Sequence, residues 1–349
     1  MTPILKEPLF GKTLTQLESV ADGVGLPRYA AKQLAGWLYR QDATELQEMA
    51  NLPQEARQRL DERFCIGISP PVGQQVSTDD TRKYIFKTQH GLIETVCIPE
   101  QDRRTLCISS QVGCRMGCAF CMTGKQGFQG QLTAGEILNQ IRSVPERHQL
   151  TNIVYMGMGE PFDNLAAVLD SVEILTSHYG FGLPPRHVTV STAGIAAGVR
   201  AYLERCGSPL ALSLHSPFED ERRKLMPIEN ASPLREIIAI IRETPKASQR
   251  RIFFEYIVFK DMNHSQRHVD ELARLLNGMR CRINLLRVHP VPGIPLESPD
   301  DVAMLAFRDA LMAKGFITTV RRSRGQDIAA ACGLLSSQPG RQAGGTEIK

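Results

Sequence analysis

The chain has 349 residues, of which 42% are hydrophobic and 6% aromatic, and its formal net charge is +4. No apolar run approaches the roughly 18 residues that a membrane-spanning helix requires, and the first twenty residues have the pattern of neither a secretory signal nor a transit peptide. We therefore expect a globular cytoplasmic protein with no membrane partner, and so small a net charge does not by itself indicate a nucleic-acid partner.

Two kinds of local pattern follow one another in the first hundred residues. In residues 12–70, "AAKQLAGWLYR" and "PQEARQRLDERF" place apolar side chains three and four positions apart, which predicts helices. Residues 71–100 instead alternate around the turn signal Gln89-His90-Gly91, which predicts a β-hairpin. We expect a helical N-terminal accessory domain over residues 1–70 and a β-hairpin linker over residues 71–100.

From residue 105 onward, short apolar strands alternate with helical stretches. The expected strands are "TLCIS", "NIVYMGM", "HVTVST", "LALSLH", "RIFFEYIVF" and "RINLLRVH". The capping box formed by Thr133 and Glu136 marks the start of the first helix. Six strands separated by helices predict an α/β fold with a parallel sheet, a partial (β/α)6 barrel over residues 101–335, followed by a flexible polar tail over residues 336–349.

In such a barrel, the chemistry belongs on the loops at the carboxyl ends of the strands. The residues of chemical interest fall there. Cys114, Cys118 and Cys121 follow the first strand, and "GMGEP" (157–161) follows the second. Later strands end at Ser191, at Ser213 to His215 and at His289.

The nine cysteines do not suggest a disulfide framework, because the count is odd and four of them lie within residues 107–121. A structural zinc site uses four protein ligands, usually from two C-x2-C pairs, and no second pair follows Cys121. The spacing C-x3-C-x2-C suits an iron–sulfur cluster with one iron left open to a substrate or cofactor. The alternative is a zinc site completed by a distant histidine.

The three cysteines, together with a "GEP" motif after the second strand, resemble the radical S-adenosylmethionine (radical SAM) superfamily. Over nearly the whole chain, "SSQVGC", "GFQGQLTAGEI", "GMGEP", "VTVSTAG", "SLH", "LMPI" and "RRSRGQDIAAACGLL" resemble the RlmN/Cfr family of RNA adenine methyltransferases. The resemblance implies that Cys114, Cys118 and Cys121 hold a 4Fe-4S cluster. It also implies that S-adenosyl-L-methionine is contacted by Gly159, Glu160, Ser191, Ser213, Leu214, His215 and His289.

The resemblance also implies a role for three further residues. One S-adenosylmethionine methylates Cys332, whose thiolate is a competent nucleophile. Reductive cleavage of a second S-adenosylmethionine generates a radical that activates this methyl group for addition to the adenine. Cys107 then releases the product by forming a disulfide with Cys332, while Glu94 removes the ring proton.

Each of these residues has a simpler interpretation when the family is set aside. Cys107 and Cys332 would be small buried side chains, and Glu94 an exposed carboxylate on a hairpin. The remaining cysteines match no motif, so we expect Cys65, Cys97, Cys206 and Cys281 to belong to the core. The chain departs from the family at His289, which stands in "VHPVPG" where an Asn is usual; imidazole lacks the paired donor and acceptor of an amide.

The implied function is methylation of carbon 2 of an adenosine in 23S rRNA, tRNA or both. Methylation of carbon 8 would use the same residues, and a third possibility is an RNA-binding protein that keeps the cluster without catalysis. The implied partners are RNA and an electron donor such as flavodoxin or ferredoxin. Basic runs, each also typical of a solvated face, would contact phosphates if RNA binds; they include Arg103 and Arg104, Arg222 to Lys224, Arg250 and Arg251, and "VRRSRG" from Val320.

Overall fold

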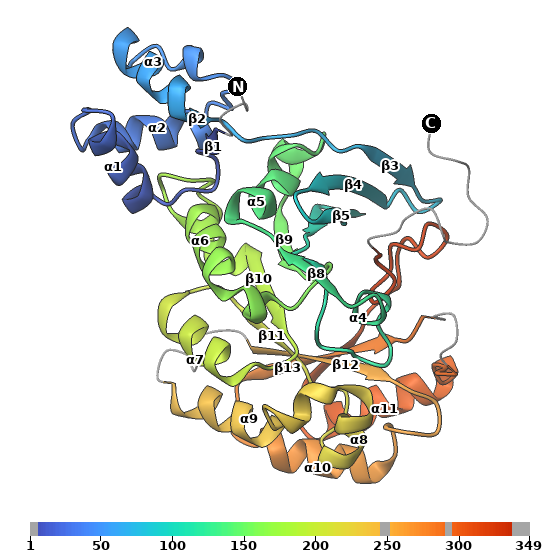
Figure 1. Ribbon diagram of the computed structural model, residues 1–349. Coiled ribbons are helices and arrows are strands. Elements are labelled where there is room, and N and C mark those ends of the chain that lie inside the picture. Colours follow the sequence, from blue (N-terminus) through green and yellow to red (C-terminus); the bar gives the residue numbers. More distant parts are fainter. Residues whose placement is uncertain (1–5, 245–251, 290–294, 337–349) are drawn as a thin grey trace.

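The computed structural model describes residues 6–244, 252–289 and 295–336. Within these residues the largest sheet has ten strands, and the seven from β14 to β6 run parallel (Figure 1). From one edge to the other, the strands are β14 (Ile317–Val320), β13 (Cys281–Arg287), β12 (Ile252–Val258), β11 (Leu210–Ser213), β10 (Val188–Thr192), β9 (Asn152–Tyr155), β6 (Arg103–Cys107), β5 (Gly91–Glu100), β4 (Arg82–Thr88) and β3 (Gly73–Val76).

All six predicted parallel strands are present, which confirms the α/β fold class. The structure adds β14 beyond the sixth strand, where it pairs with β13. Strands β14 and β3 lie at the two edges of the sheet, so the barrel is open. Because the neighbouring strands are parallel, their carboxyl ends share one rim, as expected for the site.

Helices connect the parallel strands. The longer ones are α5 (Ala134–Arg142), α6 (Leu165–Thr176), α7 (Ala196–Arg205), α9 (Leu234–Glu243), α10 (Gln266–Leu276) and α11 (Asp301–Ala313). The capping box predicted for α5 is present: Glu136 N donates to Thr133 Oγ1 at 3.1 Å, and Thr133 N donates to Glu136 Oε2 at 2.9 Å. Shorter elements are α4 (Met122–Lys125), α8 (Glu219–Leu225), η2 (Arg147–Gln149), η3 (Pro161–Asn164), η4 (Pro185–His187) and η5 (Pro227–Asn230), with β7 (Gln111–Gly113) paired to β8 (Phe128–Gln131).

The hairpin predicted before the barrel is formed by β4 and β5, with its turn at Gln89 and His90. It differs from a separate linker in one respect. Strand β5 pairs antiparallel with β6, the first strand of the barrel, so the hairpin extends the main sheet. Only the two turn residues Gln101 and Asp102 separate β5 from β6, so this pairing is a second local hairpin.

The N-terminal helices form a layer beside the sheet, at the upper left of Figure 1. They are α1 (Leu14–Gly23), α2 (Ala30–Tyr39), η1 (Leu46–Glu48) and α3 (Gln54–Arg63), with a small parallel pair between β1 (Glu7–Pro8) and β2 (Phe64–Cys65). Leu17 and Leu34 are fully buried between them, as the periodic apolar pattern predicts. The helical character of this region is therefore confirmed.

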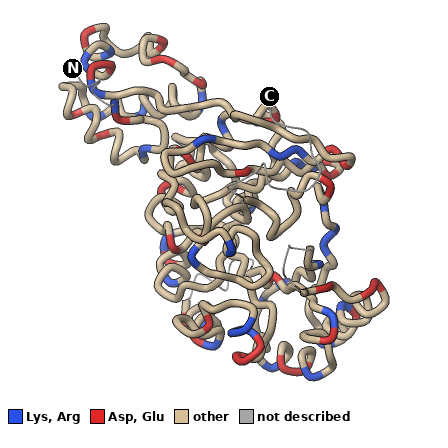
Figure 2. The backbone as a smooth tube through the Cα atoms, turned by 45° about the vertical axis from the view of Figure 1, so that its right-hand side comes forward, with Lys and Arg blue, Asp and Glu red and all other residues tan. Residues whose placement is uncertain are grey.

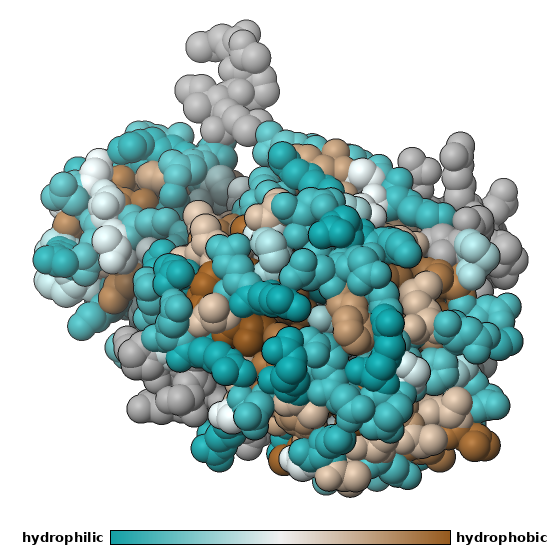
Figure 3. Space-filling view, turned by 90° about the horizontal axis from the view of Figure 1, so that it is seen from below, coloured by the Kyte–Doolittle hydropathy of each residue, from teal (hydrophilic) through white to brown (hydrophobic). Residues whose placement is uncertain are grey.

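The surface mixes charges of both signs. Lys and Arg positions and Asp and Glu positions are both scattered over the tube, and neither sign is confined to one region (Figure 2). The face seen from below is largely hydrophilic, with small hydrophobic patches between polar side chains (Figure 3). In the described part of the chain, every helix is too short or too polar to span a bilayer.

Candidate active site

Strand register places four of the predicted site residues, Glu94, Cys107, Ser191 and Ser213, on one face of the sheet. Residues that pair directly on neighbouring strands point to the same face, as do alternate residues within a strand. Cys107 pairs with Val96, two residues after Glu94, and with Val154 on its other side. Following the register across β9, β10 and β11 brings Ser191 and Ser213 to this same face.

The opposite face of the sheet packs against the helices. There the hydroxyls of Tyr155 and Ser171 of α6 share a hydrogen bond of 2.7 Å, and the ring of Tyr256 packs against Phe307 of α11. The face that carries Glu94, Cys107, Ser191 and Ser213 therefore lines the inside of the barrel.

The predicted cluster ligands lie on the loop after β7, which we call the cysteine loop (residues 114–121). Cys114 is buried, and Cys118 and Cys121 are half-buried. Burial raises the pKa of Cys114 to about 12 and raises that of Cys118 as well; the neighbouring thiols add to both effects, so the three sulfurs lie near one another. Within the described residues, no three His, Cys, Asp or Glu side chains converge tightly enough to form a metal site.

Hydrophobic side chains support the cysteine loop. Phe120 packs against Phe259 and meets the ring of His215 edge-on, with ring centroids 5.9 Å and 4.8 Å apart. The same small cluster includes Met226 and Ile257. The backbone N of Ala119 also donates to the Leu225 carbonyl at 2.9 Å, which fixes the loop to the end of α8. In donor type, three thiols on a loop with an apolar surround suit an iron–sulfur cluster, although in this structure the three side chains are not drawn together as they would be around a metal.

The turn after β9 depends on a glycine. Gly159 has φ of +99°, and a Cβ there would lie 2.5 Å from the Cβ of Gln111. Glu160 is buried, and its carboxylate accepts hydrogen bonds from Thr192 Oγ1 at 2.6 Å, Ala193 N at 2.7 Å and Phe162 N at 3.0 Å. The Glu160 side chain thus joins the carboxyl ends of β9 and β10.

The prediction that Arg222 is solvated or contacts phosphates is wrong. The basic run of residues 222–224 was expected to be solvated or to contact phosphates, but Arg222 is completely buried and forms an ion pair with Glu229. Its guanidinium also donates to the carbonyls of Ala193 at 2.7 Å and Leu214 at 3.2 Å. The physical reason is that these carbonyls lie at strand ends without a neighbouring strand to satisfy them. Arg250 and Arg251 lie outside the described residues.

The two predicted histidine contacts are both buried. Burial, and then the charge of Arg222, lowers the pKa of His215 to about 3, so this side chain is neutral. Its Nδ1 accepts a hydrogen bond from Ile257 N at 2.9 Å. His289 lies 3.2 Å from the Ser323 hydroxyl through Nε2, and burial lowers its pKa too.

Glu94 is buried rather than exposed. Lys83, which is buried as well, lies 2.9 Å from Glu94 Oε1, and the backbone N of Ser336 donates to Oε2 at 2.8 Å. Burial raises the pKa of Glu94, while the Lys83 charge acts in the opposite direction. The interpretation of Glu94 as an exposed hairpin carboxylate is therefore wrong.

Cys332 lies on the segment after β14, and this segment is hydrogen-bonded to α4, the short helix that directly follows the cysteine loop. Met122 N donates to the Gly333 carbonyl at 2.8 Å, and Thr123 Oγ1 donates to the Leu335 carbonyl at 2.8 Å. Cys332 is an exposed residue. Desolvation by the surrounding protein raises the pKa of its thiol most, and the negative charge of Glu255 raises it further.

Cys107 is buried in the same neighbourhood. Its pKa is raised by burial first and by Cys332 second, which indicates that the two sulfurs are close enough to interact. All nine cysteines lie in the described part of the chain and all are free, so a disulfide between Cys107 and Cys332 is not supported as a feature of this structure. Of the cysteines expected in the core, Cys97 is buried, and the other three, Cys65, Cys206 and Cys281, are half-buried.

Sequence reasoning missed two charged residues inside the barrel, Lys83 and Glu255. Glu255 pairs with Ser213 and Asn284 on the neighbouring strands, and Asn284 Nδ2 donates to Glu255 Oε1 at 2.8 Å. A carboxylate within the otherwise apolar strand "RIFFEYIVF" was the available signal. Lys83 had a similar signal in "RKYIF".

A loop with three cysteines at the carboxyl rim of a partial parallel barrel is the arrangement expected of a radical SAM enzyme, and comparisons with known proteins show that this protein is one. Residues 108–276 match the radical SAM superfamily, whose members use S-adenosylmethionine and a 4Fe-4S cluster. Residues 8–66 match the N-terminal domain of ribosomal RNA large subunit methyltransferases.

Relatives with assigned activities extend over almost the entire chain. The chain is 51% identical to a probable dual-specificity RNA methyltransferase RlmN of Parabacteroides distasonis, over 95% of this chain and 97% of the relative. It is 39% identical to the dual-specificity RNA methyltransferase RlmN of Syntrophus aciditrophicus, over 93% and 95%. A crystal structure of a radical SAM methyltransferase from Sphaerobacter thermophilus matches with a TM-score of 0.87 and 40% identity, over 95% of this chain and 99% of that one. The chain belongs to the RlmN family of radical SAM RNA methyltransferases.

Proposed function

We propose that the protein methylates carbon 2 of an adenosine in 23S rRNA, tRNA or both, in the cytoplasm, with Cys332 as the carrier of the transferred carbon. The observation that carries this proposal is the position of Cys332. Its segment is hydrogen-bonded to α4, which directly follows the cysteine loop, the residue is exposed, and the buried Cys107 interacts with it. The relatives named dual-specificity RNA methyltransferases support the substrate class.

The proposed cofactor ligands lie on the loops at the carboxyl rim of the barrel. Cys114, Cys118 and Cys121 would hold the 4Fe-4S cluster. S-adenosylmethionine would be contacted by Gly159, Glu160, Ser191, Ser213, Leu214, His215 and His289. When bound, the cluster and S-adenosylmethionine supply a methyl group for Cys332 and the radical chemistry that activates it. Because the Glu160 carboxylate is occupied by protein donors, its contact with the cofactor would come from the backbone.

Cys332 is suited to carrying the carbon because it can be reached from solvent. Its raised pKa keeps the resting residue a protonated thiol, so the thiol must lose its proton when the methyl group is transferred to sulfur. Cys107 is suited to releasing the product. It lies inside the barrel near Cys332, where its sulfur can attack the Cys332 sulfur and break the bond to the transferred carbon.

Glu94 is the proposed base that removes the proton from the modified ring carbon. Burial alone would favour the protonated carboxyl, which could not accept this proton. Lys83 and the Ser336 amide both stabilise the ionised form. Since Ser336 follows Cys332 by four residues, the base and the carbon carrier are joined by the same docked segment.

RNA would bind through exposed basic side chains. Arg223, Lys224, Arg321 and Arg322 are exposed and available to phosphates, so RNA affinity should fall steeply as salt increases. The N-terminal helices would help to hold the RNA, and the target base would leave its stack to reach the barrel. A flavodoxin or ferredoxin is the proposed electron donor.

The test compares RNA from cells with and without the protein. Digested 23S rRNA and tRNA are analysed by chromatography and mass spectrometry beside 2-methyladenosine and 8-methyladenosine standards. The proposal predicts that 2-methyladenosine is present only when the protein is present. The appearance of 8-methyladenosine instead would identify carbon 8 as the target. No difference between the two RNAs, together with no cleavage of S-adenosylmethionine by reduced protein, would identify a non-catalytic RNA-binding protein.

A further inference from the structure

Side chains from other elements bind three consecutive backbone carbonyls in the turn of Ser213, Leu214 and His215. Arg222 of α8 donates to the Ser213 carbonyl at 3.1 Å and to the Leu214 carbonyl at 3.2 Å. Asn263 donates to the His215 carbonyl at 2.7 Å. These carbonyls lie where β11 ends, and their side-chain donors replace the hydrogen bonds of a sheet.

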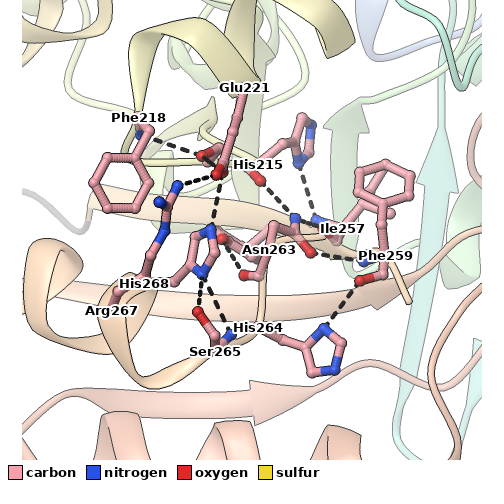
Figure 4. A network of polar contacts seen from close by, with 12 residues as sticks. His215, Phe218, Glu221, Ile257, Phe259, Asn263, His264, Ser265, Arg267 and His268 are labelled. Carbon is pink, nitrogen blue, oxygen red and sulfur yellow. Dashed lines mark hydrogen bonds and ion pairs between the residues drawn. The ribbon is translucent and has the colours of Figure 1, made fainter. Parts of the chain in front are cut away.

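Asn263 uses both ends of its amide. It is completely buried, and Nδ2 donates to the Ile257 carbonyl at 2.7 Å as well as to His215. Its Oδ1 accepts from Phe259 N at 2.8 Å. Figure 4 shows Asn263 joining His215 to the end of β12. An amide has a donor and an acceptor, whereas an ionised carboxylate can only accept, so Asp cannot make the same contacts.

The backbone of His215 requires this support. Its φ of +58° lies in the left-handed region, which residues other than glycine rarely adopt. Ile257, whose carbonyl Asn263 binds, also supplies the N–H that donates to His215 Nδ1 at 2.9 Å. Because Nδ1 is an acceptor and the ring is neutral, the hydrogen of the imidazole lies on Nε2.

The His215 ring lies against Phe120 of the cysteine loop, with the two ring planes nearly perpendicular. Ser216, the residue that follows His215, is held by a second set of hydrogen bonds. Ser216 Oγ donates to Glu221 Oε2 at 2.6 Å, and His268 Nε2 lies 2.9 Å from the same oxygen (Figure 4). The turn is thereby held from both α8 and α10.

We propose that Asn263 is a positioning residue of the S-adenosylmethionine site. It fixes the left-handed backbone of His215 and the Ile257 segment, so that His215 presents a neutral Nε2–H donor to the cofactor. This inference rests on the proposed function, in which His215 contacts S-adenosylmethionine.

The test measures S-adenosylmethionine affinity by equilibrium dialysis on anaerobically reconstituted protein. The variants are His215→Ala, Asn263→Asp and the double variant. Asn139→Asp is the matched control, because Asn139 is also buried and also uses both ends of its amide, but on Ser69 and Ser143, away from this turn. We expect His215→Ala and Asn263→Asp each to bind S-adenosylmethionine about tenfold more weakly than the wild type. The double variant should bind as tightly as the more impaired of the two single variants, because both changes remove the same contact. The control should match the wild type within about twofold.

Different outcomes overturn different claims. Normal binding by His215→Ala would refute the assignment of His215 as a cofactor contact, and with it part of the proposed function. Weak binding by His215→Ala with normal binding by Asn263→Asp would refute the positioning role alone, as would fully additive losses in the double variant.

A second measurement does not depend on the variants folding. Nitrogen NMR of histidine side chains in the full wild-type chain should show His215 protonated at Nε2 and unprotonated at Nδ1. The opposite tautomer would overturn the proposal.

Discussion

Replacing Lys83 by Met is expected to destabilise the folded chain by about 3–5 kcal/mol, the cost of removing one partner from a buried ion pair. Lys83 Nζ lies 2.9 Å from Glu94 Oε1, and the two side chains are 1% and 0% exposed. At an effective dielectric constant of about 20, unit charges at 2.9 Å attract by roughly 6 kcal/mol. The loss is smaller than this attraction because the abandoned Glu94 can take up a proton.

A surface pair of equal length provides the control. Lys6 Nζ lies 2.9 Å from Asp61 Oδ1, but these side chains are 40% and 53% exposed. Lys6→Met should cost less than about 1 kcal/mol, because water screens an exposed pair. Urea unfolding followed by circular dichroism measures both variants. The double variant Lys83→Met/Glu94→Gln should recover most of the lost stability, since removing both charges leaves no unpaired ion.

The loss should also depend on pH. Burial raises the pKa of Glu94 above that of an unfolded carboxyl, so folding favours the protonated form. As pH rises from the unfolded pKa to the folded pKa, the contribution of Glu94 to folding stability therefore becomes less favourable. Removing Lys83 raises the pKa further. The penalty of Lys83→Met should therefore be small in acid and grow toward neutral pH. Equal losses for Lys83→Met and Lys6→Met, or a loss independent of pH, would refute this reasoning.

Three further predictions concern the cofactor site. Anaerobically reconstituted protein should contain one oxygen-sensitive 4Fe-4S cluster by iron and sulfide analysis. Joint replacement of Cys114, Cys118 and Cys121 by Ala should abolish the cluster. The presence of zinc without sulfide would contradict the assignment. His289→Asn should preserve or improve S-adenosylmethionine binding, whereas His289→Ala should weaken it by roughly 1–2 kcal/mol, and equal affinities for all three proteins would place His289 outside the site. Gly159→Ala should lower the free energy of unfolding by about 1–3 kcal/mol in urea titrations, because its φ is +99° and the added Cβ meets Gln111; an unchanged midpoint would argue against this geometry.

The strand and helix pattern of the barrel could be predicted because its signals are short-range. The capping box of Thr133 and Glu136 spans four residues, and each parallel strand is a compact apolar run between turns. The positions of the candidate site residues followed from the same pattern, because the carboxyl ends of parallel strands share a rim.

Features that depend on long-range contacts could not be predicted. Within the basic run of residues 222–224, nothing local indicates that Arg222 turns inward toward carbonyls of other strands. Lys83 and Glu94 lie on the two strands of the predicted hairpin, but they are diagonal neighbours rather than a direct pair, so the exact register is needed to identify their contact. The left-handed backbone of His215 depends on Asn263, 48 residues later in the chain.

The central claim, that Cys332 carries the transferred carbon and Cys107 releases it, is tested most directly with the Cys107→Ala variant. This variant keeps the thiol that is methylated but lacks the sulfur that attacks the thioether. With labelled RNA, reduced cluster-loaded Cys107→Ala protein should accumulate as a covalent protein–RNA adduct on denaturing gels, and peptide mass mapping should locate the adduct on Cys332. Cys332→Ala should form no adduct. Normal turnover by Cys107→Ala, or an adduct on any residue other than Cys332, would contradict the account.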